Sequence, residues 1–377
     1  MLTQAATRHV REFVVPRASP VFSLYLDTAA RPANQGKAYA LRVKEALKAL
    51  EVPRPLARSL LSALEAAPPQ GRSRIVFAGQ GLMEIYDLQA ELPLVQGVEA
   101  RWGEPYLTPL LYLLEEYPRV GVVFLDSEKW RMFEVFLGEI EELSGAFRPV
   151  DPGEWRQLRQ DGLGRRYSQG MTLGGGADSD HFERRLEAWT YRFYKQMVGQ
   201  LEGLLHGREI QRLVLMGQPS EVQTLETLLP RRLREKVWTV LPALTTPSSH
   251  ADEVLRRVEA ALEPLERQRE SELVDGLIER GVGGLDQTLE LLQQGRLRLV
   301  VAPWNLQGQA YRAPDDWVGG STEGAIAHGA GRIQDVELRR VLPELCQRYA
   351  TRLEFVRGQA ETRLVERLGG LAGLERW

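Results

Sequence analysis

Apolar and polar positions in the first third of the chain follow the periods of short strands and amphipathic helices. Val21–Asp27 alternates as a half-buried strand does, and a polar loop follows it. Two helices separated by a pair of prolines come next. The buried face of the first helix is predicted at Ala40, Val43, Leu47 and Leu50. Residues 74–78 and 82–86 then predict two strands, so this region is expected to be an α/β domain.

The middle of the chain also alternates between strands and helices. Val120–Asp126 is a continuous apolar run typical of a buried strand, and Arg131–Leu137 is expected to pair with it, the strand pair ending near Glu142. Further along, the expected elements are a strand at Ile210–Met216, a helix at Glu221–Leu229 and a strand at Val237–Leu241. Because strands and helices alternate, the sheet is expected to contain parallel pairs.

A long amphipathic helix is predicted to begin near Phe182. Its apolar stripe consists of Phe182, Leu186, Trp189, Phe193, Met197 and Leu204. Asp180 is followed three residues later by Glu183, an acidic variant of a capping box that supports this helix start. Tyr191 and Arg192 fall off the stripe and are expected at the surface.

The pattern restarts after Pro247. The expected elements are a long helix over His250–Arg280, a short helix over Leu285–Gln294, a strand over Arg298–Ala302, a helix over Gln334–Tyr349 and a strand over Arg352–Val356. The predicted fold class is therefore α/β, with mixed sheets in three consecutive domains at residues 1–117, 118–247 and 248–377.

The charge of the chain excludes a generic polycation. Its 377 residues carry a formal net charge of -3, and arginine greatly outnumbers lysine, with 42 arginines and six lysines. This bias fits planar contacts to phosphate, and it equally fits a GC-rich genome. A near-neutral total still allows a local basic patch that binds RNA.

Cysteine usage and hydropathy indicate a soluble cytoplasmic protein. Cys346 is the single cysteine, so neither an internal disulfide nor a cysteine-based zinc site is expected, and its apolar helical setting predicts a small core residue. No apolar run approaches the roughly 20 residues of a membrane helix, and the first 18 residues lack a secretory apolar core. We expect no membrane partner.

A polar loop between the strand pair and the long helix is the strongest candidate site. Residues 155–170 hold four arginines against one acid, Asp161, and Trp155 adds a flat aromatic face. Arginine and aromatic side chains together can contact phosphates and stack on bases, with affinity that falls as salt rises. The candidate RNA contacts are Arg156, Arg159, Arg165, Arg166 and Tyr167. The alternative is a solvated surface loop with ordinary arginines.

The same loop contains a glycine triplet and a glutamine. Gly174, Gly175 and Gly176 could let the backbone approach a nucleotide closely, or could act as a hinge before the helix. They match neither a Walker A sequence nor a dinucleotide fingerprint. Gln169, beside Gly170, joins the candidate RNA contacts and could also supply a catalytic amide if the loop folded suitably. No catalytic residue, metal ligand or cofactor is assigned from spacing.

Four stretches together resemble the archaeal and eukaryotic peptide release factors and Pelota, in particular their bacterial branch. They are Ser23–Asp27, the strand pair with basic glycine loop and long helix, Asp286–Ala302, and the glycine-rich terminus Leu368–Trp377. In the release factors the loop carries Gly-Gly-Gln, and Ala177 falls about where that glutamine would lie. The resemblance therefore implies a ribosome-directed protein that lacks the hydrolytic group.

Within that superfamily, the absence of the glutamine makes the chain resemble bacterial hibernation factors of the Balon type. The resemblance implies occupancy of the ribosomal A site in idle or stalled ribosomes, with stress-related use and elongation factor Tu as a companion. The first domain would face the decoding centre, the loop would face ribosomal RNA or a tRNA end, and the third domain would face a partner. Some relatives carry a cysteine pair where this chain has Asp315 to His328, so zinc is not expected here. No DNA partner is implied.

Two other functions stay open at this point. The chain could be a peptide release factor or peptidyl-tRNA ester hydrolase that uses Gln169 or a backbone-held water. It could also be a protein-interaction scaffold unrelated to ribosomes, in which the loop arginines meet an acidic partner.

Overall fold

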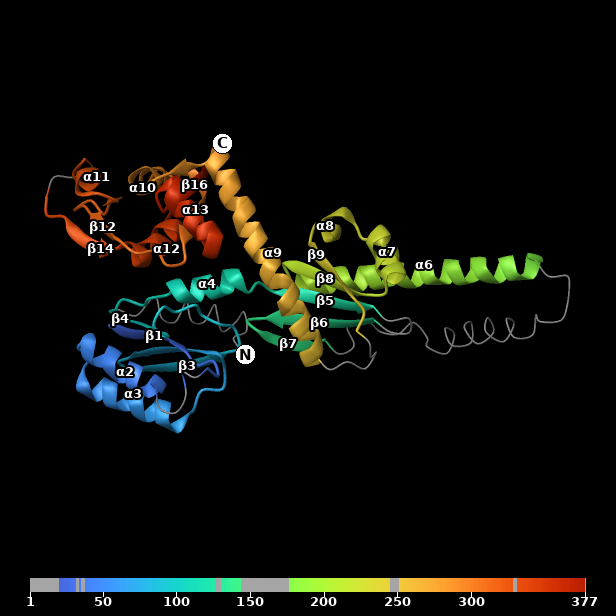
Figure 1. Cartoon of the computed structure of the whole chain (residues 1–377), viewed down its shortest axis with the longest axis horizontal. Coiled ribbons are helices and arrows are strands. Elements are labelled where there is room, and N and C mark those ends of the chain that lie inside the picture. Colours follow the sequence, from blue (N-terminus) through green and yellow to red (C-terminus); the bar gives the residue numbers. More distant parts are fainter. Residues whose placement is uncertain are drawn as a thin grey trace. The chain divides into compact units, whose positions relative to one another are not determined.

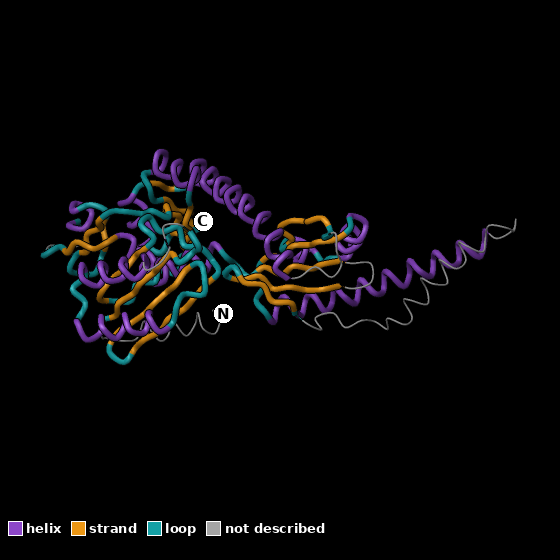
Figure 2. Tube along the Cα trace, turned by 60° about the horizontal axis from the view of Figure 1, so that its bottom comes forward, coloured by secondary structure: helices purple, strands orange, loops and turns teal. Residues whose placement is uncertain are grey.

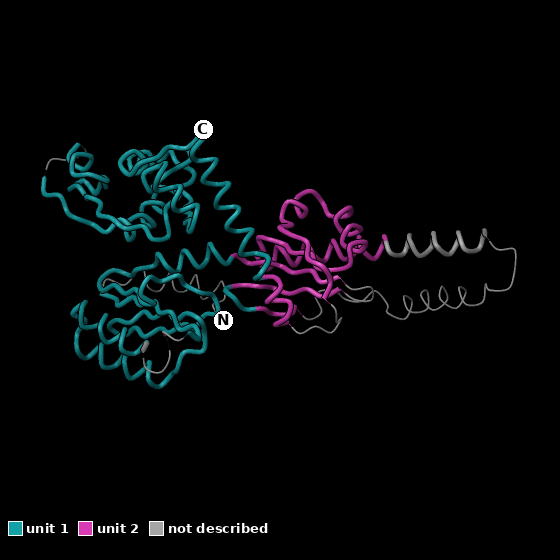
Figure 3. Tube along the Cα trace, viewed as in Figure 1, with its two compact units in different colours: residues 1–117, 137–139, 259–377 teal, residues 118–136, 140–258 magenta. Residues whose placement is uncertain are grey.

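The computed structural model describes residues 20–31, 34, 38–125, 130–143, 176–244, 251–327 and 331–376, without the side chains of residues 38 and 176–190. These residues form two compact units (Figure 3). Unit 1 comprises residues 1–117, 137–139 and 259–377, and unit 2 comprises residues 118–136 and 140–258. The division into three domains stays a prediction.

The amino-terminal part of unit 1 is an antiparallel sheet covered by two helices (Figure 1). The sheet has the order β3-β2-β1-β4, with bounds β1 Val21–Asp27, β2 Ser73–Gly79, β3 Leu82–Leu88 and β4 Val98–Gly103. Helices α2 (Ala38–Ala49) and α3 (Arg54–Ala66) share a core with β1, which confirms the predicted buried positions Val43 and Leu47. Strand β4 and helix α4 (Thr108–Glu116) were not predicted.

The carboxy-terminal part of unit 1 contains a mixed sheet of order β10-β16-β11-β15, in which β11 and β15 are parallel. The elements of this sheet and its helices are α9 Ala251–Arg280, β10 Val282–Gly283, α10 Leu285–Gln293, β11 Leu297–Pro303, α12 Leu338–Arg348, β15 Arg352–Val356, α13 Gly358–Leu368 and β16 Ala372–Glu375. A second sheet has the order β13-β12-β14, and its elements are β12 Gln309–Arg312, β13 Val318–Gly319, α11 Thr322–Ile326 and β14 Gln334–Glu337.

The predicted helix over Gln334–Tyr349 is wrong in its first turn. Residues Gln334–Glu337 form strand β14, which pairs with β12 in a register that puts Val336 opposite Ala310. Helix α12 begins only at Leu338. A four-residue edge strand with three polar side chains carries too little periodic pattern to be distinguished from a helix start.

Unit 2 is a mixed sheet of order β7-β6-β5-β8-β9. Its strands are β5 Val120–Leu125, β6 Trp130–Phe136, β7 Glu139–Glu142, β8 Arg212–Gly217 and β9 Val237–Pro242, and its helices are α6 Gly176–Gly207, α7 Pro219–Leu228 and α8 Arg231–Arg234. Strand β8 runs parallel to both β5 and β9, as predicted, while β6 is antiparallel to β5. The predicted polar turn at residues 127–129 lies outside the described residues.

Helix α6 begins at Gly176, six residues before the predicted start at Phe182. Asp180 and Glu183 therefore lie inside the helix, and the predicted capping box is wrong. Ala177 is also helical. Alanine has the highest helix propensity, and acidic residues in a first turn interact favourably with the positive end of the helix dipole, which accounts for the earlier start.

The carboxy-terminal half of α6 packs along the sheet of unit 2 (Figure 2). Its buried residues are Tyr194, Met197, Val198, Leu201 and Leu205. Met197 of the predicted stripe is confirmed, whereas Phe193 and Leu204 lie half-buried at its edge. Tyr191 and Arg192 are exposed, as expected.

Candidate functional site

The predicted RNA-contacting loop lies almost wholly outside the described residues. This applies to Arg156, Arg159, Arg165, Arg166, Tyr167, Gln169, Gly174 and Gly175, whereas Gly176 is the first residue of α6. The structure thus describes the two ends of the loop, at Leu143 after β7 and at Gly176. Both ends belong to unit 2.

A cluster of aromatic rings fixes α6 to the strand pair that precedes the loop. The ring centroid of Trp130 on β6 lies 4.8 Å from that of Tyr194 and 5.8 Å from that of Phe193, both edge-on. On the same strand pair, the backbone N–H of Leu143 donates to the Met132 carbonyl at 2.8 Å, and both side chains lie in the core. Edge-to-face pairs contribute about 0.5–1.5 kcal/mol each beyond their burial. The strand pair before the loop and the carboxy-terminal half of the helix after it therefore share one packed core.

Unit 2 also contains a buried carboxylate that is paired with two arginines. Glu134 on β6 is 1% exposed and accepts hydrogen bonds from Arg119 and from Arg208, the latter at 3.1 Å. The guanidinium of Arg119 also lies 4.0 Å from the ring centroid of Phe136. A charge this deeply buried is tolerated only when it is paired and hydrogen-bonded.

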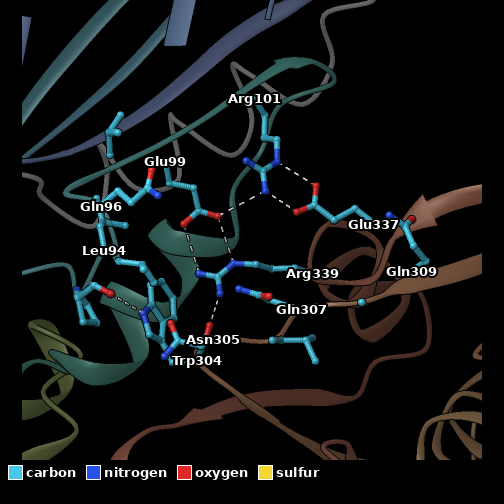
Figure 4. Close-up of a pocket in the computed structure, with 15 residues that line it drawn as sticks. Leu94, Gln96, Glu99, Arg101, Trp304, Asn305, Gln307, Gln309, Glu337 and Arg339 are labelled. Atoms are coloured by element: carbon cyan, nitrogen blue, oxygen red, sulfur yellow. Dashed lines mark hydrogen bonds and ion pairs between the residues drawn. The ribbon is translucent and has the colours of Figure 1, made fainter. Parts of the chain in front are cut away.

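Unit 1 contains a polar pocket of about 500 Å³ between segments far apart in sequence (Figure 4). Its walls come from residues 93–101, from residues 304–309, and from Glu337 and Arg339 where β14 passes into α12. Glu99 and Arg101 of β4 alternate with Glu337 and Arg339 of the carboxy-terminal part. Arg101 Nε donates to Glu337 at 2.9 Å, and Arg339 Nε lies 3.2 Å from Glu99.

Arg339 forms the floor of this pocket. It is 7% exposed, and its Nε donates to the Tyr106 hydroxyl at 2.8 Å while another N–H donates to the Trp304 carbonyl. The Tyr106 hydroxyl in turn donates to Glu99 at 2.6 Å. Burial, with repulsion from the Glu99 carboxylate, raises the pKa of Tyr106 well above its usual value. The phenol therefore stays a hydrogen-bond donor across the physiological pH range.

None of these pocket residues was singled out from the sequence. Glu99 and Arg339 are 240 positions apart, and isolated charged residues on a half-exposed strand read as ordinary surface. The only available signal was the alternation of Val98, Ala100 and Trp102, which face the core of the first sheet. That alternation would have predicted β4 and placed Glu99 and Arg101 on its other face.

A second charged cluster in unit 1 joins α4, α9 and β15. Carboxylate oxygens of Glu116, Glu266 and Glu270 lie within 4.8 Å of one another, close enough to share a cation. Arginines already supply the positive charge: Arg267 bonds both Glu116 and Glu270, and Arg357 bonds Glu116 at 2.6 Å. The donor set therefore suits an internal salt-bridge network better than a metal.

Carboxyl groups outnumber arginines in this cluster, and the pKa values of two of the carboxyls are raised. Burial, with repulsion from Glu116, raises the pKa of Glu270 from 4.5 to about 7, although the neighbouring Arg267 opposes the shift. Burial likewise raises the pKa of Glu115, and Glu354 adds repulsion. A carboxyl whose folded pKa is raised favours folding when protonated, so its contribution is complete below about pH 4.5 and is lost as the pH rises through 7.

Glu270→Gln is therefore expected to flatten the pH dependence of stability. Between pH 5 and pH 8 the wild type should lose about 2 kcal/mol more unfolding free energy than the variant, since one pKa unit is worth about 1.4 kcal/mol. The measurement is urea denaturation at both pH values, with Glu366→Gln on the exposed face of α13 as a control for the loss of a carboxyl. Parallel pH profiles for wild type and Glu270→Gln would contradict the assignment.

Asp315 and Asp316, from the region where some relatives carry a cysteine pair, make contacts within unit 1. Asp316 pairs with Arg312 and Arg348, and Asp315 accepts the backbone N–H of Trp317, while His328 lies outside the described residues. Cys346 is buried on α12, as predicted, and burial raises the pKa of its thiol to about 12. A thiol held in its neutral form is a poor nucleophile.

The sequence of the middle of the chain decides the relationship. Residues 105–263 match the family model of bacterial archaeo-eukaryotic release factor family 10. The resemblance to the release factor superfamily is thereby confirmed. Over 212 residues the chain is also 28% identical to a peptide chain release factor subunit 1 of Methanopyrus kandleri. That alignment covers 54% of this chain and 47% of the relative, so the chain spans about half the length of the curated relative it matches.

Solved structures of a translation termination factor and of Pelota proteins align over long stretches at low identity. An archaeal translation termination factor covers 100% of this chain and 98% of its own, at 12% identity and a TM-score of 0.23. Pelota of Archaeoglobus fulgidus covers 81% of this chain and 79% of its own, at 13% identity and a TM-score of 0.30. An archaeal Pelota from a ribosome-bound complex with ABCE1 covers 100% and 94%, at 11% identity and a TM-score of 0.41.

Among the helices of the described residues, none combines the length and the apolar character that crossing a membrane requires.

Proposed function

We propose that this protein is a ribosome-binding translation factor that occupies the A site of idle or stalled ribosomes without hydrolysing peptidyl-tRNA. The observation that carries the proposal is the match of residues 105–263 to the release factor family, because this segment contains the entire basic loop between β7 and α6. Unit 2 supports it because the strand pair before the loop and the carboxy-terminal half of α6 after it share one core.

The absence of hydrolysis rests on the position of Ala177. A methyl group can neither orient a water molecule nor donate to a leaving oxygen, and here Ala177 lies within α6. The proposed contacts are those of Arg156, Arg159, Arg165, Arg166, Tyr167, Gln169 and the glycines 174–176 with ribosomal RNA or a tRNA end. Elongation factor Tu is the proposed companion on the carboxy-terminal part, and stress the proposed condition.

Co-sedimentation with ribosomes across a salt series tests this proposal. The wild-type protein should pellet with ribosomes at low salt, and the logarithm of its affinity should fall linearly with that of the salt concentration as phosphate contacts are lost. Ribosomes from growing and from starved cells should be compared, with and without elongation factor Tu. Absence of binding in every arm would contradict the proposal.

Peptide release is the second candidate, because the curated relative at 28% identity is a peptide chain release factor subunit. In that case Gln169 would be the first residue to test. The experiment is release of labelled peptide from ribosome-bound peptidyl-tRNA by the wild type and by Gln169→Ala. Peptide release by the wild type would establish hydrolysis. If Gln169→Ala released peptide equally well, a water held by the backbone, and not Gln169, would carry the reaction.

A further inference from the structure

The charged groups of the polar pocket in unit 1 satisfy one another. Both carboxylate oxygens of Glu337 accept from Arg101, and Glu99 accepts from Tyr106 and faces both Arg101 and Arg339. With two carboxylates and two guanidinium groups, the inner wall is neutral and its strongest donors and acceptors are already used. A phosphate or a free cation would have to break these pairs, so the pocket is suited to an uncharged ligand.

The rim of the pocket presents amides and apolar surface instead. Gln96, Gln307 and Gln309 are exposed and offer paired N–H donors and carbonyl acceptors. Beside them lies Val95, which is 80% exposed, the highest fraction among the exposed large hydrophobic side chains of the described residues. An uncovered valine next to a row of carboxamides is the surface that a polypeptide backbone with an apolar side chain complements.

The pocket offers no stacking platform for a base. Trp304 is its single aromatic lining residue and is 2% exposed. Its ring packs against Tyr112 at a centroid distance of 4.0 Å, Arg339 lies over it at 4.2 Å, and its Nε1 donates to the Pro93 carbonyl. Proteins that hold unpaired bases expose such rings for stacking. The pocket therefore differs in chemistry from the basic loop of residues 155–170.

One wall of the pocket is an edge strand. Val98, Glu99 and Arg101 belong to β4, which pairs with β1 on one side and, in the described part of the chain, with no strand on the other. Strand edges of this kind accept an added strand, since main-chain hydrogen bonds supply affinity and neighbouring pockets supply specificity. The volume of about 500 Å³ lies within the usual range of small-ligand sites.

We infer that this pocket binds a short, extended, uncharged segment of a protein partner, with an apolar side chain on Val95 and backbone amides on the glutamines of the rim. The site is separate from the proposed RNA-contacting loop and does not depend on it. A partner that carries such a segment is therefore recruited through unit 1 whether or not the protein also contacts RNA.

The test uses the full-length protein and the acetylated, amidated peptide Ser-Leu-Thr-Val-Ser as probe, titrated by saturation-transfer NMR. A dissociation constant of about 1 mM or lower is expected, which corresponds to about −4 kcal/mol. Val95→Asp and the double variant Gln307→Ala/Gln309→Ala should each weaken binding by about fivefold or more. Because these side chains are exposed, the variants should unfold at the same temperature as the wild type.

Control variants and control ligands test whether peptide binding is specific to this pocket. Gln294 is an exposed glutamine directly after α10, and Gln294→Ala should bind the peptide as the wild type does. A peptide with alternate amides N-methylated should bind more weakly. The saturation-transfer signal of adenosine should be the same with the wild type and with Val95→Asp. Equal binding by wild type and Val95→Asp, or displacement of the peptide by adenosine, would overturn the inference and, in the second case, indicate a nucleoside site.

Discussion

Replacing Arg165 and Arg166 with alanine is expected to weaken ribosome binding by about a hundredfold at low salt. A hydrogen bond to a charged group contributes about 1.5 kcal/mol at the lower end of its range, so two lost phosphate contacts amount to about 3 kcal/mol. The slope of affinity against salt should also become shallower, by about one unit for each lost phosphate contact. Co-sedimentation of wild type and variant over the same salt series measures both effects.

The matched control is Arg256→Ala/Arg257→Ala. These two arginines are adjacent and exposed on α9, so the control removes the same charge from a different surface. Its binding should stay within about twofold of the wild type, because exposed charges act only weakly over more than a Debye length. Equal losses in the two double variants would assign the effect to net charge and not to the loop.

Arg119→Ala is expected to lower the unfolding free energy of unit 2 by about 3 kcal/mol. Removing one partner of a buried ion pair costs about 3–5 kcal/mol, because the remaining charge is left uncompensated. Here Glu134, 1% exposed, would keep only Arg208, whose side chain is 45% exposed. The contact of Arg119 with the Phe136 ring would be lost as well.

Urea denaturation followed by tryptophan fluorescence and far-UV circular dichroism measures this change. Arg231→Ala serves as a control, since that side chain is 93% exposed and its ion pair with Glu235 should be worth no more than about 0.5 kcal/mol. The double variant Arg119→Leu/Glu134→Leu should recover stability, because an apolar pair leaves no buried charge. A loss in Arg119→Ala no larger than that in Arg231→Ala would refute the structural role of Glu134.

Elements with a strong periodic pattern were predictable from the chain alone. Strands β1, β5 and β8 are buried nearly throughout, and their apolar runs placed them to within two residues. Strands β4 and β14 were missed because they are half-exposed edge strands whose outer faces carry charged residues. At such positions packing partners far away in sequence, and not local preference, determine the conformation.

The candidate site was likewise only partly predictable from the sequence. Composition and order of residues 155–177 sufficed to indicate a basic loop and, through the resemblance, its family, because charge density and glycine content are local properties. The start of α6 at Gly176 was not predicted, since the acidic and alanine residues that extend the helix also fit a loop with a cap near Asp180.

The sequence by itself determined the α/β class, the alternation that leads to parallel pairs in unit 2, the buried cysteine and the resemblance of the middle segment to a release factor family. Only the tertiary structure decided which charged side chains form ion pairs. Glu99 contacts Arg339, Glu116 contacts Arg267 and Arg357, and β4 becomes the wall of a neutral, amide-rimmed pocket. The physical reason is that periodicity reports which face of an element is buried, whereas ion pairs between distant segments depend on how those faces are brought together.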